Sequence, residues 1–174
     1  VPAGFTFWDL HVAIQDAMGW LDYHLHAFRM RDPVEGAPDE IGLPIDDFVD
    51  DIVTAASWRV PVSRYLNEAH PECDYEYDFG DSWRHRLRLE AIEPADPAQV
   101  YPRLVDGRRA CPPEDVGGAH GYEHFLAALA DPTDEEHESY RTWVGRPFDP
   151  DAFDPAQVSF DDAGERWVHA FSVG

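Results

Sequence analysis

The fold of this chain is decided by the stretch DYEYDFGDSWRHRLRLEAI, residues 74–92, which is typical of a β-hairpin. Aromatic and acidic residues alternate up to Phe79, and apolar residues alternate with arginine from Trp83 onward. Alternation with a period of two places each set of side chains on its own face of a strand. Gly80-Asp81-Ser82, between the two runs, is typical of a turn. We therefore predict two antiparallel strands with one face in the core.

The alternation also predicts which residues face one another across this hairpin. We pair Phe79 with Trp83 over a three-residue loop. The apolar face then holds the pairs Tyr77–His85 and Tyr75–Leu87, and the polar face holds Asp78–Arg84, Glu76–Arg86 and Asp74–Arg88. Each cross-strand pair of opposite charge contributes about 0.2 to 1 kcal/mol. Because carboxylates neutralise the arginines, we interpret this stripe as structural and not as a phosphate-binding surface.

The segments around the hairpin contain both helical and strand patterns. Thr6, with Asp9 three residues later, predicts the capped start of a helix that ends at Gly19. We predict further helices over 44–56, over 63–69 with Ser63 as cap, over 122–130, and over 133–145 with a Thr133/Glu136 capping box. Strands are predicted over 22–30 and 166–173, and loops over 31–43 and 94–121. The chain is therefore predicted to be one α+β domain, residues 1–174, with a mixed or antiparallel sheet whose central hairpin (74–92) is packed by several helices.

The charge of the chain disfavours one class of function. Its 174 residues include 35 acidic and 13 basic residues, all of the latter arginine, for a net charge of −22. Such a chain repels phosphate backbones, so direct nucleic-acid binding is disfavoured. We interpret the acidic surface as salt-adapted or highly soluble, with a specific cationic partner as the alternative.

Composition also predicts where the protein resides. No apolar run approaches the about 18 to 20 residues that span a bilayer, and Val1-Pro2-Ala3-Gly4 does not begin a signal peptide. Two cysteines, Cys73 and Cys111, are too few for a disulfide framework. We therefore predict a cytoplasmic protein without membrane association and leave its oligomeric state open.

Histidines form the best candidate for a chemical centre. In the predicted strand over 22–30, His24 and His26 share one face, which lets two imidazoles approach one metal ion. The other candidate ligands are His11, His85, Asp78 and Asp81, with Glu114 and Asp115 as alternative carboxylates. Histidine and carboxylate ligands with an open position are typical of catalytic Zn or non-haem Fe. The alternative is that these histidines are buried hydrogen-bonding groups that fix the sheet.

Other catalytic chemistries have weaker support. Cys111 precedes two prolines and does not begin a helix, so no local helix N-terminus lowers the pKa of its thiol. Ser82 lies in a turn, whereas alternation sends His85 to the buried face. Gly117-Gly118 lacks the lysine of a P-loop and indicates a sharp turn.

Several short motifs follow one another in a specific order. They are Leu10-His11, Gly19-Trp20, HLHAF at 24–28, YEYDFGDSW at 75–83 with His85, CPPED at 111–115, Gly117-Gly118, Gly121-Tyr122, Asp131-Pro132, Trp143-Val144-Gly145 and Phe148-Asp149-Pro150. Together they resemble the plasmid pRiA4b ORF-3-like family, whose members include an insertion-element passenger protein, from about Phe5 to Val158. The resemblance implies an α+β fold and an association with mobile elements, and it implies no established activity.

The chain departs from the family pattern in two places. Many members have cysteines where this chain has Leu104 and Val116, so a Cys-rich zinc site is not expected here. Members usually begin with a further strand before the residues that match Val1-Pro2.

Two hypotheses about function follow. In the first, which we favour, the protein is a non-enzymatic interaction or accessory domain. Its aromatic surface, made by Tyr75, Tyr77, Trp83 and the proline-rich loop, then binds a protein or peptide partner. In the second, it is a metal-dependent enzyme with a His/carboxylate centre. The second requires imidazoles that converge in a cleft, whereas the first expects separated histidines and an exposed apolar patch.

Overall fold

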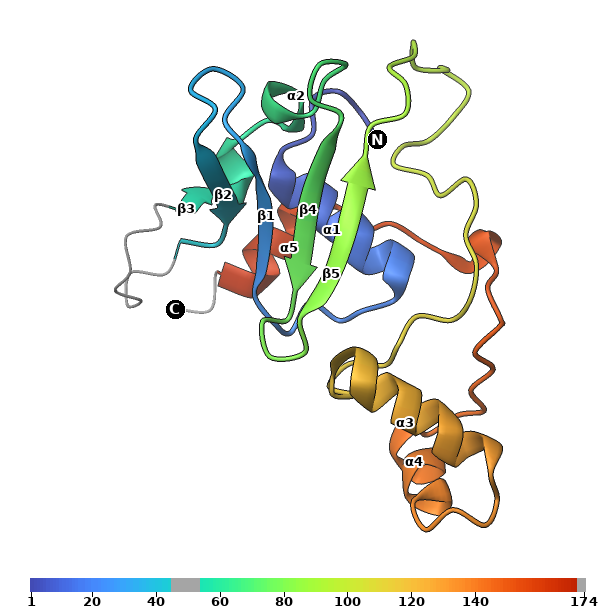
Figure 1. Ribbon diagram of the computed structural model, residues 1–174. Coiled ribbons are helices and arrows are strands. Elements are labelled where there is room, and N and C mark those ends of the chain that lie inside the picture. The colour runs from blue at the N-terminus through green and yellow to red at the C-terminus, as the bar shows by residue number, and fades with distance from the viewer. Residues whose placement is uncertain (45–53, 172–174) are drawn as a thin grey trace.

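A five-stranded mixed sheet forms the centre of the computed structural model, which describes residues 1–44 and 54–171 (Figure 1). The strand order is β3-β2-β1-β4-β5. The strands are β1 (His26–Arg31), β2 (Pro38–Gly42), β3 (Thr54–Ala56), β4 (Glu72–Tyr77) and β5 (Trp83–Arg88). Only β2 and β3 pair in parallel, and the other neighbours are antiparallel. The predicted α+β class is therefore confirmed, with a mixed sheet.

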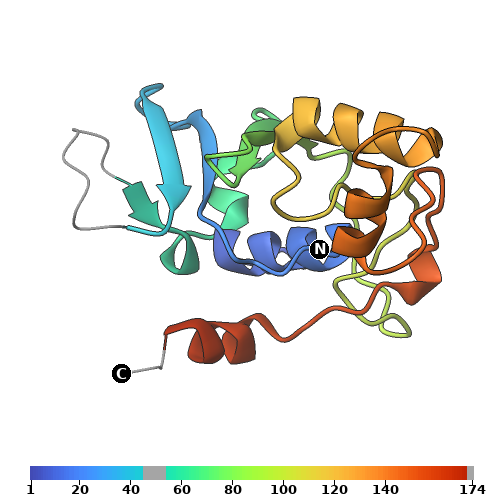
Figure 2. The same ribbon diagram turned by 90° about the horizontal axis from the view of Figure 1, so that it is seen from below.

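Helices cover one face of this sheet. The described residues hold α1 (Phe7–Met18), α2 (Val62–Tyr65), α3 (Gly118–Ala130), α4 (His137–Val144) and α5 (Ala163–Phe171), with 3₁₀ turns at Ser57–Arg59 and Pro155–Gln157. α1 lies between the sheet and α5, while α3 and α4 pack on each other beside the sheet (Figure 2). No helix in residues 1–44 and 54–171 is long and apolar enough to cross a membrane.

The first helix begins and ends as predicted. Thr6 accepts a hydrogen bond from the amide of Asp9, and the Asp9 carboxylate accepts one from the amide of Thr6, which completes a capping box. Gly19 ends the helix in the left-handed region, at φ 77°. The helix packs against β1 and β4, where Phe7, Phe28 and other apolar side chains are fully buried. The core therefore lies between α1 and the sheet.

The hairpin forms, but the predicted register is wrong by two residues. Tyr77 pairs with Trp83 and Tyr75 pairs with His85, because the loop comprises five residues, 78–82. Asp78 leaves the strand at φ 54°, and its Oδ1 accepts hydrogen bonds from the amides of Gly80 and Asp81. A shift of two keeps every side chain on its predicted face. Three pairs of opposite charge still form, but with new partners: Glu76–Arg84, Asp74–Arg86 and Glu72–Arg88.

Four predictions before the hairpin are corrected. The strand predicted over 22–30 begins only at His26, because Asp22 has a left-handed backbone with φ 59°. The loop predicted over 31–43 contains β2. The helix predicted over 44–56 falls mostly outside the described residues, and its last residues, Ala55 and Ala56, belong to β3. The helix predicted over 63–69 is shorter, because α2 comprises only Val62–Tyr65. No side chain caps it, so Ser63 does not act as the predicted cap.

Three predictions after the hairpin are also corrected. α3 begins at Gly118, before the predicted start at 122. The predicted Thr133 capping box is absent, because the Thr133 hydroxyl donates to Asp131 and α4 begins only at His137. Residues 163–171 form α5, not an edge strand. Trp167 and Phe171 of this helix pack on Trp8, which explains the weak apolar pattern that suggested a strand.

Candidate functional site

Three segments that are distant in sequence meet at the β4–β5 turn, at the lower end of the sheet in Figure 1. They are the α1–β1 connection (19–25), the turn (78–82) and the segment before α3 (111–117). The Trp20 indole donates a hydrogen bond to the Pro112 carbonyl at 3.0 Å. The Asp81 carboxylate accepts one from the Gly117 amide, also at 3.0 Å. These contacts fix the turn and the connection against the 111–117 segment.

Glu114 also connects these segments, through hydrogen bonds to the α1–β1 connection and to β4. Its Oε1 accepts hydrogen bonds from the Leu21 amide at 2.7 Å and from the Tyr77 hydroxyl at 3.0 Å. The Tyr77 hydroxyl in turn accepts one from the Tyr23 amide at 3.1 Å. Burial, with Glu114 nearby, raises the pKa of Tyr77, so its phenol stays protonated and can donate. The backbone on both sides of Asp22 is thereby held in place.

This framework brings one imidazole and two carboxylates together. His24 Nε2 lies 3.0 Å from Asp115 Oδ1 and 3.6 Å from Asp78 Oδ2. One ligand atom from each of the three residues lies within 4.8 Å of the others. Atoms bound tetrahedrally at about 2.1 Å from one Zn²⁺ are about 3.4 Å apart, so these spacings suit a shared ion. The grouping could therefore hold a metal ion.

The environment of each side chain differs. Asp78 is nearly buried, and because its Oδ1 is used by the turn amides, Oδ2 is the oxygen left for a ligand. The Asp115 side chain is 66% exposed, and that of His24 is 29% exposed. One side of the grouping is thus anchored and the other reaches solvent. This arrangement leaves room for an exchangeable ligand.

Backbone strain is concentrated at this place. Among the described non-glycine residues with positive φ, four of five lie in these segments: Asp22, Asp78, Ser82 and Asp115, with Arg109 as the exception. A left-handed backbone costs a non-glycine residue about 1 kcal/mol or more, and such residues cluster at functional sites. The strain therefore supports a functional role for these segments.

Comparison with known proteins places the chain in a family. The model of the family described as "Plasmid pRiA4b ORF-3-like protein" matches residues 1–157. The chain belongs to this family. It is 36% identical over 175 residues to the "Uncharacterized protein y4hQ" of Sinorhizobium fredii, covering 97% of this chain and 84% of the relative. The crystal structure of MM3350, a protein of unknown function from Methanosarcina mazei Go1, has a TM-score of 0.84 and 44% identity, over 92% of this chain and 86% of that chain.

The predicted resemblance to the plasmid pRiA4b ORF-3-like family is thus confirmed, and no function is established for these relatives. His24, Asp78 and Asp115 all lie within the matched residues, whereas α5 lies after them. The three side chains come from the motifs HLHAF, YEYDFGDSW and CPPED. The fold therefore gathers at one point three motifs that the sequence spreads over about ninety positions.

Two of the predicted histidine ligands lie elsewhere. His11 and His26 stack on each other, with ring centroids 3.5 Å apart and planes 13° apart, and both are buried beneath α1. Burial, together with the nearby Arg166, lowers the pKa of His11 to about 3, and burial also lowers the pKa of His26. Both rings are therefore neutral at pH 7. His11 matches the alternative of a buried hydrogen-bonding group, whereas both ring nitrogens of the buried His26 have no hydrogen-bond partner among residues 1–44 and 54–171.

The remaining predicted residues have other surroundings. His85 packs against Trp20 and Tyr75, with ring centroids 5.6 and 5.7 Å away, and is not part of the grouping. The Asp81 carboxylate accepts a hydrogen bond from the Gly117 amide and is not part of the grouping around His24. Tyr75 and Tyr77 are fully buried and Trp83 is partly buried, so these three rings do not form the predicted aromatic interaction surface. The alternation of apolar and charged residues correctly predicted the apolar face of the hairpin, and that face is buried in the core.

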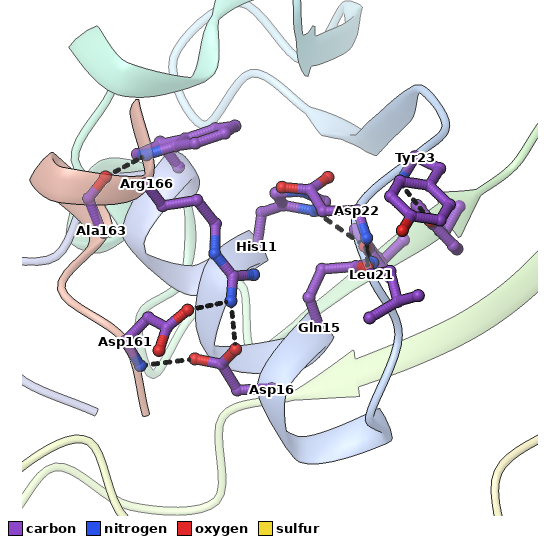
Figure 3. A network of polar contacts seen from close by, with 12 residues as sticks. His11, Gln15, Asp16, Leu21, Asp22, Tyr23, Asp161, Ala163 and Arg166 are labelled. Atoms are coloured by element: carbon purple, nitrogen blue, oxygen red, sulfur yellow. Dashed lines mark hydrogen bonds and ion pairs between the residues drawn. The ribbon is translucent and has the colours of Figure 1, made fainter. Parts of the chain in front are cut away.

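A polar network beneath α1 includes one residue that sequence reasoning missed, Asp22 (Figure 3). The Asp22 carboxylate contacts His11 Nε2 at 2.8 Å, and the Tyr75 hydroxyl contacts His11 Nδ1 at 2.9 Å. Gln15 donates to the Tyr75 hydroxyl and accepts from the Asp22 amide. Burial raises the pKa of Asp22 to about 6, while His26 and Arg166 oppose this shift. No local pattern marks Asp22, because its role depends on this long-range network.

Proposed function

We propose that the protein is a metal-dependent enzyme whose centre consists of His24, Asp78 and Asp115. The observation that carries this proposal is the grouping itself: three ligand atoms from three segments lie within 4.8 Å of one another. Three protein ligands with an open side are typical of catalytic metal sites, whereas structural sites are closed. The exposed side at Asp115 is where water or a substrate would reach the ion.

The charges of the three groups favour a cation between them. The His24 Nε2 atom is shielded from solvent, and although Asp115 Oδ1 lies 3.0 Å away, no contact of Nε2 within the described part of the chain has the geometry of a hydrogen bond. In the tautomer with its proton on Nδ1, which is the one that can bind a metal through Nε2, the Nε2 lone pair would face two carboxylates in a chain of net charge −22. A shared cation removes this repulsion and satisfies the buried nitrogen.

The donor set also indicates which metals fit. One imidazole nitrogen and two carboxylate oxygens suit Zn²⁺, Fe²⁺ or Mn²⁺ and do not suit metals that require thiolates. Burial, with Glu114 nearby, raises the pKa of Cys111 to about 12, so its thiol stays protonated at pH 7 and is a poor ligand. The centre would supply Lewis-acid chemistry, while Asp78 and His24 position the ion and Asp115 faces the solvent side.

A non-enzymatic binding role is the second candidate, and one observation favours it. No described helix covers the outer face of the sheet, where Arg84 and Arg86 are more than two-thirds exposed (Figure 1). Arg29 there contacts both Glu40 and Glu76. Charges of both signs alternate on this face, which suits a polar protein or peptide partner better than a phosphate backbone. Association with mobile elements stays a prediction.

The metal proposal is tested by calorimetric titration of chelator-treated protein with Zn²⁺ and Mn²⁺. We expect one equivalent to bind, with at least a tenfold loss of affinity in His24→Ala and in Asp115→Asn. The matched control is His70→Ala, because His70 is exposed and bonds to the described residues through its backbone. Equal affinity in His24→Ala and His70→Ala, in folded proteins, would overturn the proposal.

A further inference from the structure

A pocket with a volume of about 350 Å³ lies between the α1–β1 connection and α5. Its apolar walls are formed by Trp8, Tyr23, Leu25, Leu43 and Phe171. Within the described ranges, Asp22 is the one carboxylate that lines it. His24 lines its other side, so the pocket is adjacent to the candidate metal centre without containing Asp78 or Asp115. Its volume is that of a site for a small molecule.

Three aromatic residues, Trp8, Tyr23 and Phe171, line the pocket. The Trp8 indole N–H is already used, because it donates to the Ala163 carbonyl at 2.8 Å. Phe171 packs against Trp8 with ring centroids 5.9 Å apart and is 48% exposed. Tyr23 is also largely exposed, at 70%. Aromatic faces attract organic cations through their quadrupoles as well as apolar groups.

The carboxylate at this pocket is held by a dedicated buried network. Because an ionised carboxylate can only accept, His11 Nε2 donates to Asp22 Oδ1, and His11 Nδ1 then accepts a hydrogen bond from the Tyr75 hydroxyl. Gln15 donates a hydrogen bond to the Tyr75 hydroxyl and accepts one from the Asp22 amide, so it holds both residues that contact His11. His11, Gln15 and Tyr75 are all fully buried, and their mutual hydrogen bonds offset the cost of burial and hold the Asp22 carboxylate in one position. Oδ2 of Asp22 has no hydrogen-bond partner among residues 1–44 and 54–171.

We propose that this pocket binds a small organic cation, an amine or quaternary ammonium that carries an aromatic or aliphatic group. The positive group would pair with Asp22 Oδ2, and the apolar group would lie against Trp8 and Phe171. The net charge of −22 attracts cations to the whole molecule and repels anions. The pocket needs no metal ion, so this inference goes beyond the proposed function.

The test is calorimetric titration of the full chain, in the presence of a chelator, with benzylamine, benzyltrimethylammonium, benzyl alcohol and benzoate. We expect the two cations to bind saturably, benzyl alcohol to bind at least tenfold more weakly, and benzoate not to bind. Asp22→Asn should lower benzylamine affinity at least tenfold, whereas Asp151→Asn, at an exposed position far along the chain, should not. Because the chelator removes any metal ion, failure here is distinguishable from failure of the metal centre.

A second variant keeps the proposal falsifiable if Asp22→Asn does not fold. Phe171→Ala leaves the buried network intact, and we expect it to lower benzylamine affinity several-fold. Benzyl alcohol that binds as tightly as benzylamine would overturn the proposal, since the pocket would then recognise apolar surface alone. Absence of saturable benzylamine binding to the unaltered chain would also overturn it.

Discussion

At the scale of single residues, neighbouring aspartates in the β4–β5 turn have separate tasks. Asp78 uses Oδ1 to close its own turn and leaves Oδ2 toward His24. Asp81 joins the turn to the Gly117 amide and does not face the imidazole. One residue is thus a candidate ligand, and the other positions the segment that carries Asp115. The distinction is invisible in the sequence, where both carboxylates occur in the same motif.

Gly118 lets the segment before α3 approach this turn. A Cβ atom there would lie 2.5 Å from the Asp81 carbonyl oxygen, and φ is 66°. At Gly19, φ is 77° but a Cβ atom would meet nothing within 4 Å. We therefore expect Gly19→Ala to cost about 1 to 2 kcal/mol for the backbone conformation alone. Gly118→Ala should cost more, because the backbone clash adds to the same strain.

The pair is compared by urea unfolding at pH 7, with Gly19→Ala as the matched control. Metal affinity should also fall in Gly118→Ala, because the clash moves the segment that carries Asp115. A Gly118→Ala variant as stable as Gly19→Ala would show that the 111–117 segment is not docked on the turn.

At the scale of secondary-structure elements, α1 and β1 enclose a pair of neutral histidines. His11 comes from the helix and His26 from the strand, and they stack in the core. The groups facing His11 are Asp22, His26, Tyr75 and, from α5, Arg166. Neither imidazole carries a charge at neutral pH, so the α1–β1 contact depends on their remaining unprotonated.

Acid should therefore weaken the fold. The pKa of His11 is lowered from 6.5 to about 3, so between these values the unfolded chain binds more protons and stability falls as pH decreases. His26 shifts in the same direction. Asp22, raised from 3.8 to about 6, has the opposite sign, because its protonated form is favoured in the folded state. Each shift of one pKa unit corresponds to about 1.4 kcal/mol. Because two histidines oppose one carboxyl group, we expect their combined effect on the free energy of unfolding to be the larger.

We expect the free energy of unfolding to decrease steadily from pH 6.5 toward pH 4.5, as measured by chemical denaturation at each pH. His11→Asn should be less stable at pH 7 but should lose less stability on acidification than the unaltered chain. An unaltered chain whose stability is constant or rises over this range would contradict the neutral stacked pair.

At the scale of the whole molecule, the sequence predicts the class of fold and much of the local structure. The Thr6 cap and Gly19 end of α1 were predicted because they depend on neighbours in sequence. The faces of the hairpin were predicted because side chains alternate, but the register was not, since the Asp78 turn geometry decides the loop length. The tail was mistaken for a strand because its apolar residues serve a helix that packs on Trp8.

The candidate site was predictable only in part. His24 and Asp78 stood among the predicted ligands, and Asp115 stood among the alternative carboxylates. Their meeting depends on Glu114, Asp81 and Gly118, which dock the 111–117 segment on the turn. Alternation alone grouped His24 with His26, but the chain enters the strand only at His26, so the two imidazoles diverge. The candidate metal centre therefore consists of one histidine and two carboxylates instead of the predicted group of histidines.

The most direct test of the central claim is X-ray absorption at the zinc edge of the Zn²⁺-loaded chain. We predict a first shell of one imidazole nitrogen and oxygens at about 2.0 to 2.2 Å, with no sulfur. Asp78→Asn should remove or alter this shell, because Asp78 Oδ2 faces His24. A sulfur shell at about 2.3 Å, or a nitrogen signal unchanged in His24→Ala, would contradict a centre made of His24, Asp78 and Asp115.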